Sequence, residues 1–170
     1  MRHCAEPSHY SRQSAFRFDV PAFYKEARRV LKPGGKLAAW CYSFPDIEHH
    51  AEADRVFRDF REDVLGPHKT DVMSHCERQY RDIAPSAQDF GTVERDTMPY
   101  RLETTVWHLV QFVKTGGIYA KMRRETPGKP DPLPELQKKL MAAVGTSDKM
   151  FPLTLNYTIF MLLAKDPQPL

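Results

Sequence analysis

The sequence predicts an α/β fold with a buried strand near its start, an antiparallel strand near its end and a helical insertion between them. Residues 19–35 read as a capped amphipathic helix that ends in a glycine turn, and an apolar run follows at once over 36–44. A helix, a tight turn and a buried strand form the second half of a βαβ crossover. Residues 154–165 are rich in β-branched and aromatic residues, which indicates a strand.

The helix is expected over 20–32. Asp19 can cap it, and Pro21 suits its first turn, where a missing N–H costs nothing. The inward face at helical spacing is expected to hold Phe23, Ala27, Val30 and Leu31. Gly34 and Gly35 end the helix. The strand expected over about 37–43 shows no alternation, which is typical of a parallel strand buried on both faces.

The insertion is expected to be largely helical. A helix is predicted over 46–65, a helical cap with loops over 67–90, and a weak polar strand over 93–98. Two further helices follow, one capped by Thr104 or Thr105 and ended by Gly116-Gly117, the other ended by Gly145. Their inward residues are Val106, Leu109, Val110 and Val113, then Leu133, Leu136, Leu140 and Val144.

The last strand is expected over about 154–164, antiparallel to the first in the same sheet. Its shared face should carry Leu155, Tyr157, Ile159, Met161 and Leu163. Residues 1–165 are expected to form one partial domain with the helical cap insertion at about 46–90, and 166–170 a frayed tail. Six of the fourteen prolines lie at 127–134 and in this tail, which indicates one exposed loop and the frayed end.

Composition excludes several classes of protein. The longest apolar runs are six residues, against about 20 needed to cross a bilayer, so no membrane association is expected. The N-terminus has no apolar stretch of secretory length, and the default compartment is cytoplasmic. Net charge is 25 − 22 = +3 and evenly mixed, which disfavours nucleic acid as a partner and leaves a basic binding module as the weakest reading. Three widely spaced cysteines do not suggest a disulfide framework.

The segment 13–44 resembles the middle of class I S-adenosylmethionine-dependent methyltransferases. The similarity is to the small-molecule, trans-aconitate methyltransferase-like branch, which reads Q-A-x-H-W-F-D, then a helix, then R-V-L-K-P-G-G and a strand. Gln13, Phe18, Asp19 and the run 29–35 match that pattern. Further on, residues 115–123 resemble the branch's T-W-S-x-Y segment through Thr115 and Tyr119.

This resemblance implies the carboxyl-terminal part of a Rossmann-like methyltransferase sheet, with S-adenosyl-L-methionine as cofactor and a small-molecule methyl acceptor. It places Gln13, Phe16 and Asp19 beside the cofactor. Tyr42 and Tyr119 are the candidate substrate-binding residues. The pattern departs from the branch at Phe16 (His), Arg17 (Trp) and Gly116 (Trp). The family's D-x-G-x-G-x-G cofactor turn has no counterpart, since no G-x-G occurs in the sequence.

Each candidate has a plain structural alternative. Asp19 can serve only as a helix cap, and Trp40 can be core packing. Tyr42, at a strand end, is better placed to orient a carboxylate or carbonyl. Cys41 reads as a small apolar residue. No metal site is expected, because the scattered residues His49, His50, His68, His75 and Cys76 complete no tetrahedral set.

Methyl transfer needs mainly alignment of nucleophile and methyl group together with desolvation, so the family chemistry requires no acid–base pair and none is assigned. Lys121, Arg123 and Arg124 could hold an anionic substrate or form a solvated segment. Two hypotheses follow: a truncated methyltransferase, weak or inactive alone, or a non-enzymatic fragment that acts by association through an exposed sheet edge. The missing glycine-rich turn is what separates them.

Overall fold

The computed structural model describes residues 9–12 and 19–169, and side chains are described from 19 onward except at 71–72. The chain divides into two compact units. Unit 1 comprises residues up to 43, 71–99 and 158 onward; unit 2 comprises 44–70 and 100–157. The insertion expected over 46–90 is therefore distributed over both units. Of the described helices, none is long and apolar enough to cross a bilayer.

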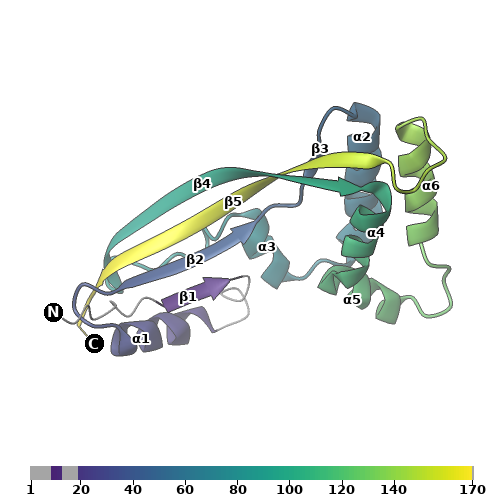
Figure 1. Ribbon diagram of the computed structural model, residues 1–170. Coiled ribbons are helices and arrows are strands. Elements are labelled where there is room, and N and C mark those ends of the chain that lie inside the picture. Colours follow the sequence, from purple (N-terminus) through teal and green to yellow (C-terminus); the bar gives the residue numbers. More distant parts are fainter. Residues whose placement is uncertain (1–8, 13–18, 170) are drawn as a thin grey trace. The chain divides into compact units, whose positions relative to one another are not determined.

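The sheet of unit 1 runs in the order β1-β2-β5-β4 (Figure 1). Strand β1 (His9–Arg12) pairs with β2 (Lys36–Tyr42) in parallel, and β2 pairs with β5 (Pro152–Pro167) antiparallel. Strand β4 (Phe90–Thr105) pairs with β5 on its other side. The expected strand near 37–43, with the last strand antiparallel to it, is confirmed.

Helix α1 (Val20–Val30) covers one face of this sheet. The expected cap is confirmed, because the Asp19 carboxylate accepts a hydrogen bond from the Ala22 amide at 3.1 Å. The inward face differs by about one residue from the prediction. Tyr24 is buried and Val30 is 38% exposed, since the stripe follows the residues Val20, Tyr24, Ala27 and Leu31.

The turn between α1 and β2 requires its glycines. Gly34 has a φ of +75°, in the left-handed region, and a Cβ on Gly35 would lie 2.8 Å from the Lys32 carbonyl oxygen. The Gly35 amide donates to that same oxygen at 2.8 Å. This pair therefore serves the reversal from helix to strand, at the amino end of β2.

The buried positions of β5 change parity along the strand. In unit 2 they are Leu153, Leu155 and Tyr157, and in unit 1 they are Phe160, Leu162 and Ala164. The prediction that one face carries alternate buried residues from 155 to 163 is thus wrong beyond Tyr157. The change falls at Thr158, where the strand passes from one core to the other.

The region expected to be one helix over 46–65 contains a short strand, an α-helix and a π-helical segment. Asp46–Ile47 forms the short strand β3, which pairs with β5, and α2 covers Ala51–Asp59. A π-helical segment continues over Phe60–Leu65 and a 3₁₀ turn over Gly66–His68. The predicted helix starts too early because the Asp46–Ile47 backbone is taken up by the sheet.

The remaining helices of unit 2 follow the sequence pattern closely. Thr105 caps α4 (Val106–Thr115), accepting from the His108 amide at 3.2 Å, and the four expected apolar residues of that helix are buried. Helix α6 (Leu133–Ala143) buries the expected leucines, with Val144 as its half-buried cap. Between them lies α5 (Gly117–Glu125), a helix that was not expected from the sequence.

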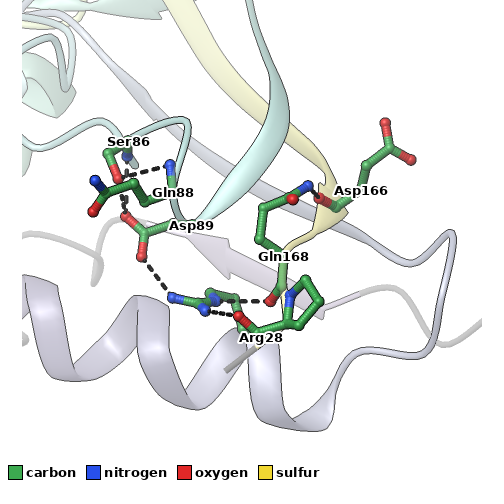
Figure 2. Close-up of polar contacts among 7 residues, drawn as sticks. Arg28, Ser86, Gln88, Asp89, Asp166 and Gln168 are labelled. Carbon is green, nitrogen blue, oxygen red and sulfur yellow. Dashed lines mark hydrogen bonds and ion pairs between the residues drawn. The ribbon is translucent and has the colours of Figure 1, made fainter.

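The end of the chain is bound to unit 1. Figure 2 shows Arg28 of α1 donating to the carbonyl oxygens of Gln168, at 3.0 Å, and Pro169, and to the Asp89 carboxylate at 3.2 Å. The Gln168 amide donates to the Asp89 carbonyl at 3.0 Å. The expectation of a frayed tail over 166–170 is therefore corrected for its described part, because these contacts hold it against α1.

Candidate functional site

The carboxyl ends of the two parallel strands meet at one edge of the unit 1 sheet. The register places Arg12, the last residue of β1, opposite Trp40 of β2. Strand β1 therefore ends two residues before the end of β2 at Tyr42. In open α/β sheets ligands bind at this edge. Among the described residues, the exit of β2 at Tyr42 therefore marks the candidate site.

The predicted cofactor residues are only partly visible at this edge. Gln13 and Phe16 lie outside the described residues. Asp19 is exposed and caps α1 through its Oδ1 atom. The plain reading of Asp19 as a helix cap is thus confirmed, and its contact with a cofactor stays a prediction.

Tyr42 is the last residue of β2 and is half-buried. It shares a face of the strand with Trp40, which is also half-buried and does not belong to the buried core. The antiparallel register places Ile159 opposite Tyr42 and Met161 opposite Trp40. This half-buried apolar face consists of Trp40, Tyr42, Ile159, Met161 and Leu163.

The other face of β2 belongs to the core. Cys41 is 4% exposed, as expected for a small apolar residue, and packs with Ala39, Tyr80 and Phe160. The Cys41 sulfur lies 3.5 Å from that of Cys76 in α3 (Asp71–Glu77). Sequence reasoning missed this pair because the two residues are 35 positions apart and α3 has no distinct pattern.

Tyr80, which packs beside these cysteines, lies in a turn with left-handed backbone angles. Gln79 and Tyr80 have φ values of +54° and +57°, in the left-handed region that bulky residues rarely adopt. The Tyr80 ring is 1% exposed and stacks edge-on against Phe160 at 5.1 Å between centroids. Burial raises the pKa of the Tyr80 hydroxyl, and both thiols add to the effect.

Tyr119 lies in α5 of unit 2, whereas Tyr42 belongs to unit 1. It is 6% exposed. Burial raises the pKa of the Tyr119 hydroxyl, and a hydrogen bond with Asp131 raises it further. The segment that resembles the family's T-W-S-x-Y motif is divided between two helices. Thr115 ends α4, where its hydroxyl donates to the Phe112 carbonyl at 2.7 Å, and Tyr119 lies in α5. A role of Tyr119 in substrate binding stays a prediction.

Arg61, which sequence reasoning missed, is a half-buried cation of unit 2. Its guanidinium carbon lies 5.2 Å from the centroids of both Phe44 and Phe57, in cation–π geometry. Burial lowers its pKa, while Asp46 and Asp54 oppose that effect. It sits on the π-helical segment, a type of distortion often found at functional sites.

Unit 2 also contains an open groove of about 590 Å³ between α2, the π-helical segment and α6. Apolar side chains and charged side chains of both signs line it. The lining includes Val56, Phe60, Val64, Leu136, Glu52, Asp59, Asp63, Glu135, Arg55 and Lys139. Arg55 is paired with Glu52 and Asp59 across one helix turn each, as is common on a solvated helix surface.

The histidines and cations of the sequence analysis have local partners. His68 lies 2.6 Å from Glu125, and His75 lies 2.8 Å from Asp82. Arg123 donates to the carbonyl oxygens of Lys129 and Pro130, which holds the proline-rich loop. Within the described ranges, no three acidic, histidine or cysteine side chains gather around a point that could hold a metal ion.

The described residues do not by themselves fit S-adenosylmethionine. The one described glycine pair beside β2 lies at the strand's amino end, where it serves a turn. Asp19, the carboxylate after β1, already accepts the Ala22 amide. Backbone amides for the methionine part and a free carboxylate for the ribose would have to come from other residues.

No protein-family profile matches the chain. In sequence it is 26% identical, over 155 residues, to a Dictyostelium discoideum protein named as a candidate methyltransferase. The match covers 90% of this chain and 57% of that protein.

In structure, the chain is similar to a candidate type II methyltransferase from Anaeromyxobacter dehalogenans, with a TM-score of 0.76 and 23% identity. That match covers 95% of this chain and 65% of the other. A candidate methyltransferase from Bacillus halodurans matches with a TM-score of only 0.37. The chain thus spans about three fifths of the length of its relatives. Its α/β fold, with an antiparallel strand in an open sheet, is similar to that of the Anaeromyxobacter structure.

Proposed function

We propose that this chain is the carboxyl-terminal part of a Rossmann-like, S-adenosylmethionine-dependent methyltransferase that acts on a small molecule. The observation that carries the proposal is the strand order β1-β2-β5-β4, with β5 antiparallel to β2. The fold similarity to the Anaeromyxobacter protein, over nearly the whole chain, supports it. The Dictyostelium relative supports the same class of activity.

In this proposal the edge formed by the carboxyl ends of β1 and β2 receives both ligands. Gln13, Phe16 and Asp19 would flank the cofactor, and the Tyr42 phenol would orient the methyl acceptor. Tyr42 is suited to this because it ends a strand and is half-buried, so that its ring is fixed while part of its surface stays accessible. The contribution of the protein is then alignment and exclusion of water.

The first test is binding of S-adenosylmethionine to the chain alone by titration calorimetry. We expect an affinity in the millimolar range or weaker. The glycine-rich cofactor turn of the family that segment 13–44 resembles has no counterpart in this sequence, so several hydrogen bonds of about 1.5–3 kcal/mol each would be missing. Micromolar binding would contradict this expectation, since it would require a complete cofactor cradle within these residues.

The second test restores what the chain lacks. The portion of the Anaeromyxobacter protein that has no counterpart here is fused to this chain, and the cofactor titration is repeated. The proposal predicts micromolar binding by the folded chimera. A chimera that folds, as judged by circular dichroism, and does not bind would refute the assignment.

Asp19→Asn supplies a matched variant within the chimera. Asparagine caps helices as well as aspartate, so α1 is retained while the charge is removed. A loss of affinity without a change in thermal midpoint would place Asp19 at the cofactor. An unchanged affinity would leave it as a cap alone.

A second candidate function is association with another chain. The half-buried apolar face Trp40, Tyr42, Ile159, Met161 and Leu163 favours it, because part of each of these apolar side chains stays accessible to a partner. Analytical ultracentrifugation tests it. Met161→Glu should abolish concentration-dependent association, whereas Lys138→Glu on α6 should not. A chain that remains monomeric at all concentrations rules this candidate out.

A further inference from the structure

Two thiols from separate elements meet inside unit 1. Cys41 lies in β2 and Cys76 in α3, and their sulfur atoms are 3.5 Å apart. Cys41 is 4% exposed, whereas Cys76 is half-buried at the margin of the same core cluster. One thiol is therefore shielded and the other accessible.

We propose that Cys41 and Cys76 are a redox-active dithiol, a modification site at which a low-molecular-weight disulfide converts the two thiols into an intramolecular disulfide. The inference does not depend on the proposed methyltransferase activity. It requires only the thiol geometry and an oxidant of the glutathione-disulfide class.

The geometry suits this bond. A disulfide needs the sulfur atoms about 2.05 Å apart, so the pair must close by about 1.5 Å. Cys76 is half-buried and lies on a seven-residue helix. Cys41 is held by the strand, where its backbone pairs with Phe160. We therefore expect most of this approach to come from Cys76.

The reaction proceeds by two exchanges that balance. The Cys76 thiolate attacks the small disulfide R–S–S–R, forming Cys76–S–S–R and releasing one R–SH. Cys41 then attacks the Cys76 sulfur, forming the Cys41–Cys76 bond and releasing a second R–SH. The two thiol hydrogens end on the two released thiols, so the dithiol is oxidised and the small disulfide is reduced.

The groups around Cys76 affect how fast its thiol is oxidised. The hydrogen bond to Cys41, burial and the nearby Glu77 all raise the pKa of the Cys76 thiol, and Tyr80 opposes them. The reactive thiolate is therefore scarce at neutral pH, and oxidation should be slow. Equilibrium must accordingly be approached from both the reduced and the oxidised chain.

The experiment uses the full chain with Cys4→Ser, which leaves only this pair of cysteines. The chain is equilibrated in glutathione buffers of graded oxidised-to-reduced ratio, natively and in urea. We expect a mass loss of about 2 Da and a non-reducing peptide map that joins the Cys41 and Cys76 peptides. The equilibrium constant for the native chain should exceed that of the unfolded chain by about tenfold or more, because the fold holds the thiols together.

Matched variants complete the test. In the same Cys4→Ser background, oxidation of the Cys41→Ala variant should stop at a glutathione adduct on Cys76. The Cys76→Ser variant should react little with oxidised glutathione, because Cys41 is shielded. The proposal is overturned by any of three results: a persisting adduct on Cys76 while Cys41 is present, equal constants in native and unfolded chains, or a native chain that stays reduced where the unfolded chain is oxidised.

Discussion

The Arg95 guanidinium donates a hydrogen bond to the carbonyl oxygen of Tyr80 at 3.1 Å. A second donor of the same group reaches the carbonyl of Gln79 at 3.0 Å. Arg95 lies in β4 and thus clamps the two consecutive residues that have left-handed backbone angles. Because left-handed conformations cost about 1–2 kcal/mol per residue, this clamp offsets a local strain.

Replacing Arg95 with alanine removes two charge-assisted hydrogen bonds. Because their surroundings are partly exposed to solvent, we expect the free energy of unfolding to fall by only about 2 kcal/mol. Urea denaturation followed by circular dichroism measures this. Arg101→Ala, which removes one exposed ion pair with Glu48, serves as the control and should cost less than about 1 kcal/mol. Equal losses for the two variants would show that the clamp adds no stability.

Gln79→Gly tests the strain itself. Glycine adopts positive φ freely, so the substitution should leave stability unchanged or raise it by up to about 1 kcal/mol. Lys138→Gly, in the exposed middle of α6, should lower it by about 1 kcal/mol. Thermal unfolding of both variants compares them. A fall of similar size for Gln79→Gly would mean that the turn carries no strain.

Where a local pattern decides the structure, the sequence predicted it well. The cap at Asp19, the buried run of β2, the cap at Thr105 and the leucine face of α6 all follow from residues within one or two turns. Helix α5 was missed because Gly116 reads as a stop. Its extended backbone, with φ −70° and ψ 137°, ends α4 but also starts the next helix.

The remaining features depend on contacts distant in sequence. Nothing in the residues of the π-helical segment distinguishes them from an ordinary helix, and Arg61 gains its environment from Phe44 as well as Phe57. The pairing of Cys41 with Cys76 likewise needs α3 to be placed first. A single sequence carries no local signal for either arrangement.

Trp40→Ala is expected to destabilise the chain by about 1–3 kcal/mol, less than the 3–5 kcal/mol typical of a large aromatic residue in the core. The reason is that Trp40 is half-buried on the sheet face described above. Phe160→Ala is the control, because Phe160 is 2% exposed and should show the full core cost. Chemical denaturation of both variants measures the two losses in the free energy of unfolding. A larger loss for Trp40→Ala than for Phe160→Ala would make the tryptophan a core residue after all.

The last prediction concerns the acid sensitivity of the contact between α1 and the end of the chain (Figure 2). Burial by itself would raise the pKa of Asp89, but hydrogen bonds from Ser86 and the Arg28 guanidinium outweigh burial and hold that pKa below its ordinary value. The Ser86 hydroxyl donates to the carboxylate at 2.8 Å and Arg28 donates at 3.2 Å.

A carboxyl group whose pKa is lower in the folded than in the unfolded chain stabilises the fold fully above its unfolded pKa of about 3.9. That stabilisation is lost as the pH falls through the lower, folded pKa. Asp89→Asn removes the titrating group but keeps an acceptor. The thermal midpoint of the variant should therefore lie below that of the unmodified chain at pH 6, and the gap should narrow as the pH falls below about 4.

Asp166→Asn is the matched control. In Figure 2 its side chain points away from Arg28, and its backbone carbonyl, not its carboxylate, accepts from Gln168. Its midpoint should follow that of the unmodified chain at every pH, because the substitution leaves the ion pair intact. A constant gap between Asp89→Asn and the unmodified chain from pH 6 to below pH 4 would contradict the prediction. It would mean that Asp89 acts through hydrogen-bond geometry alone and that its charge contributes nothing to the binding of the tail.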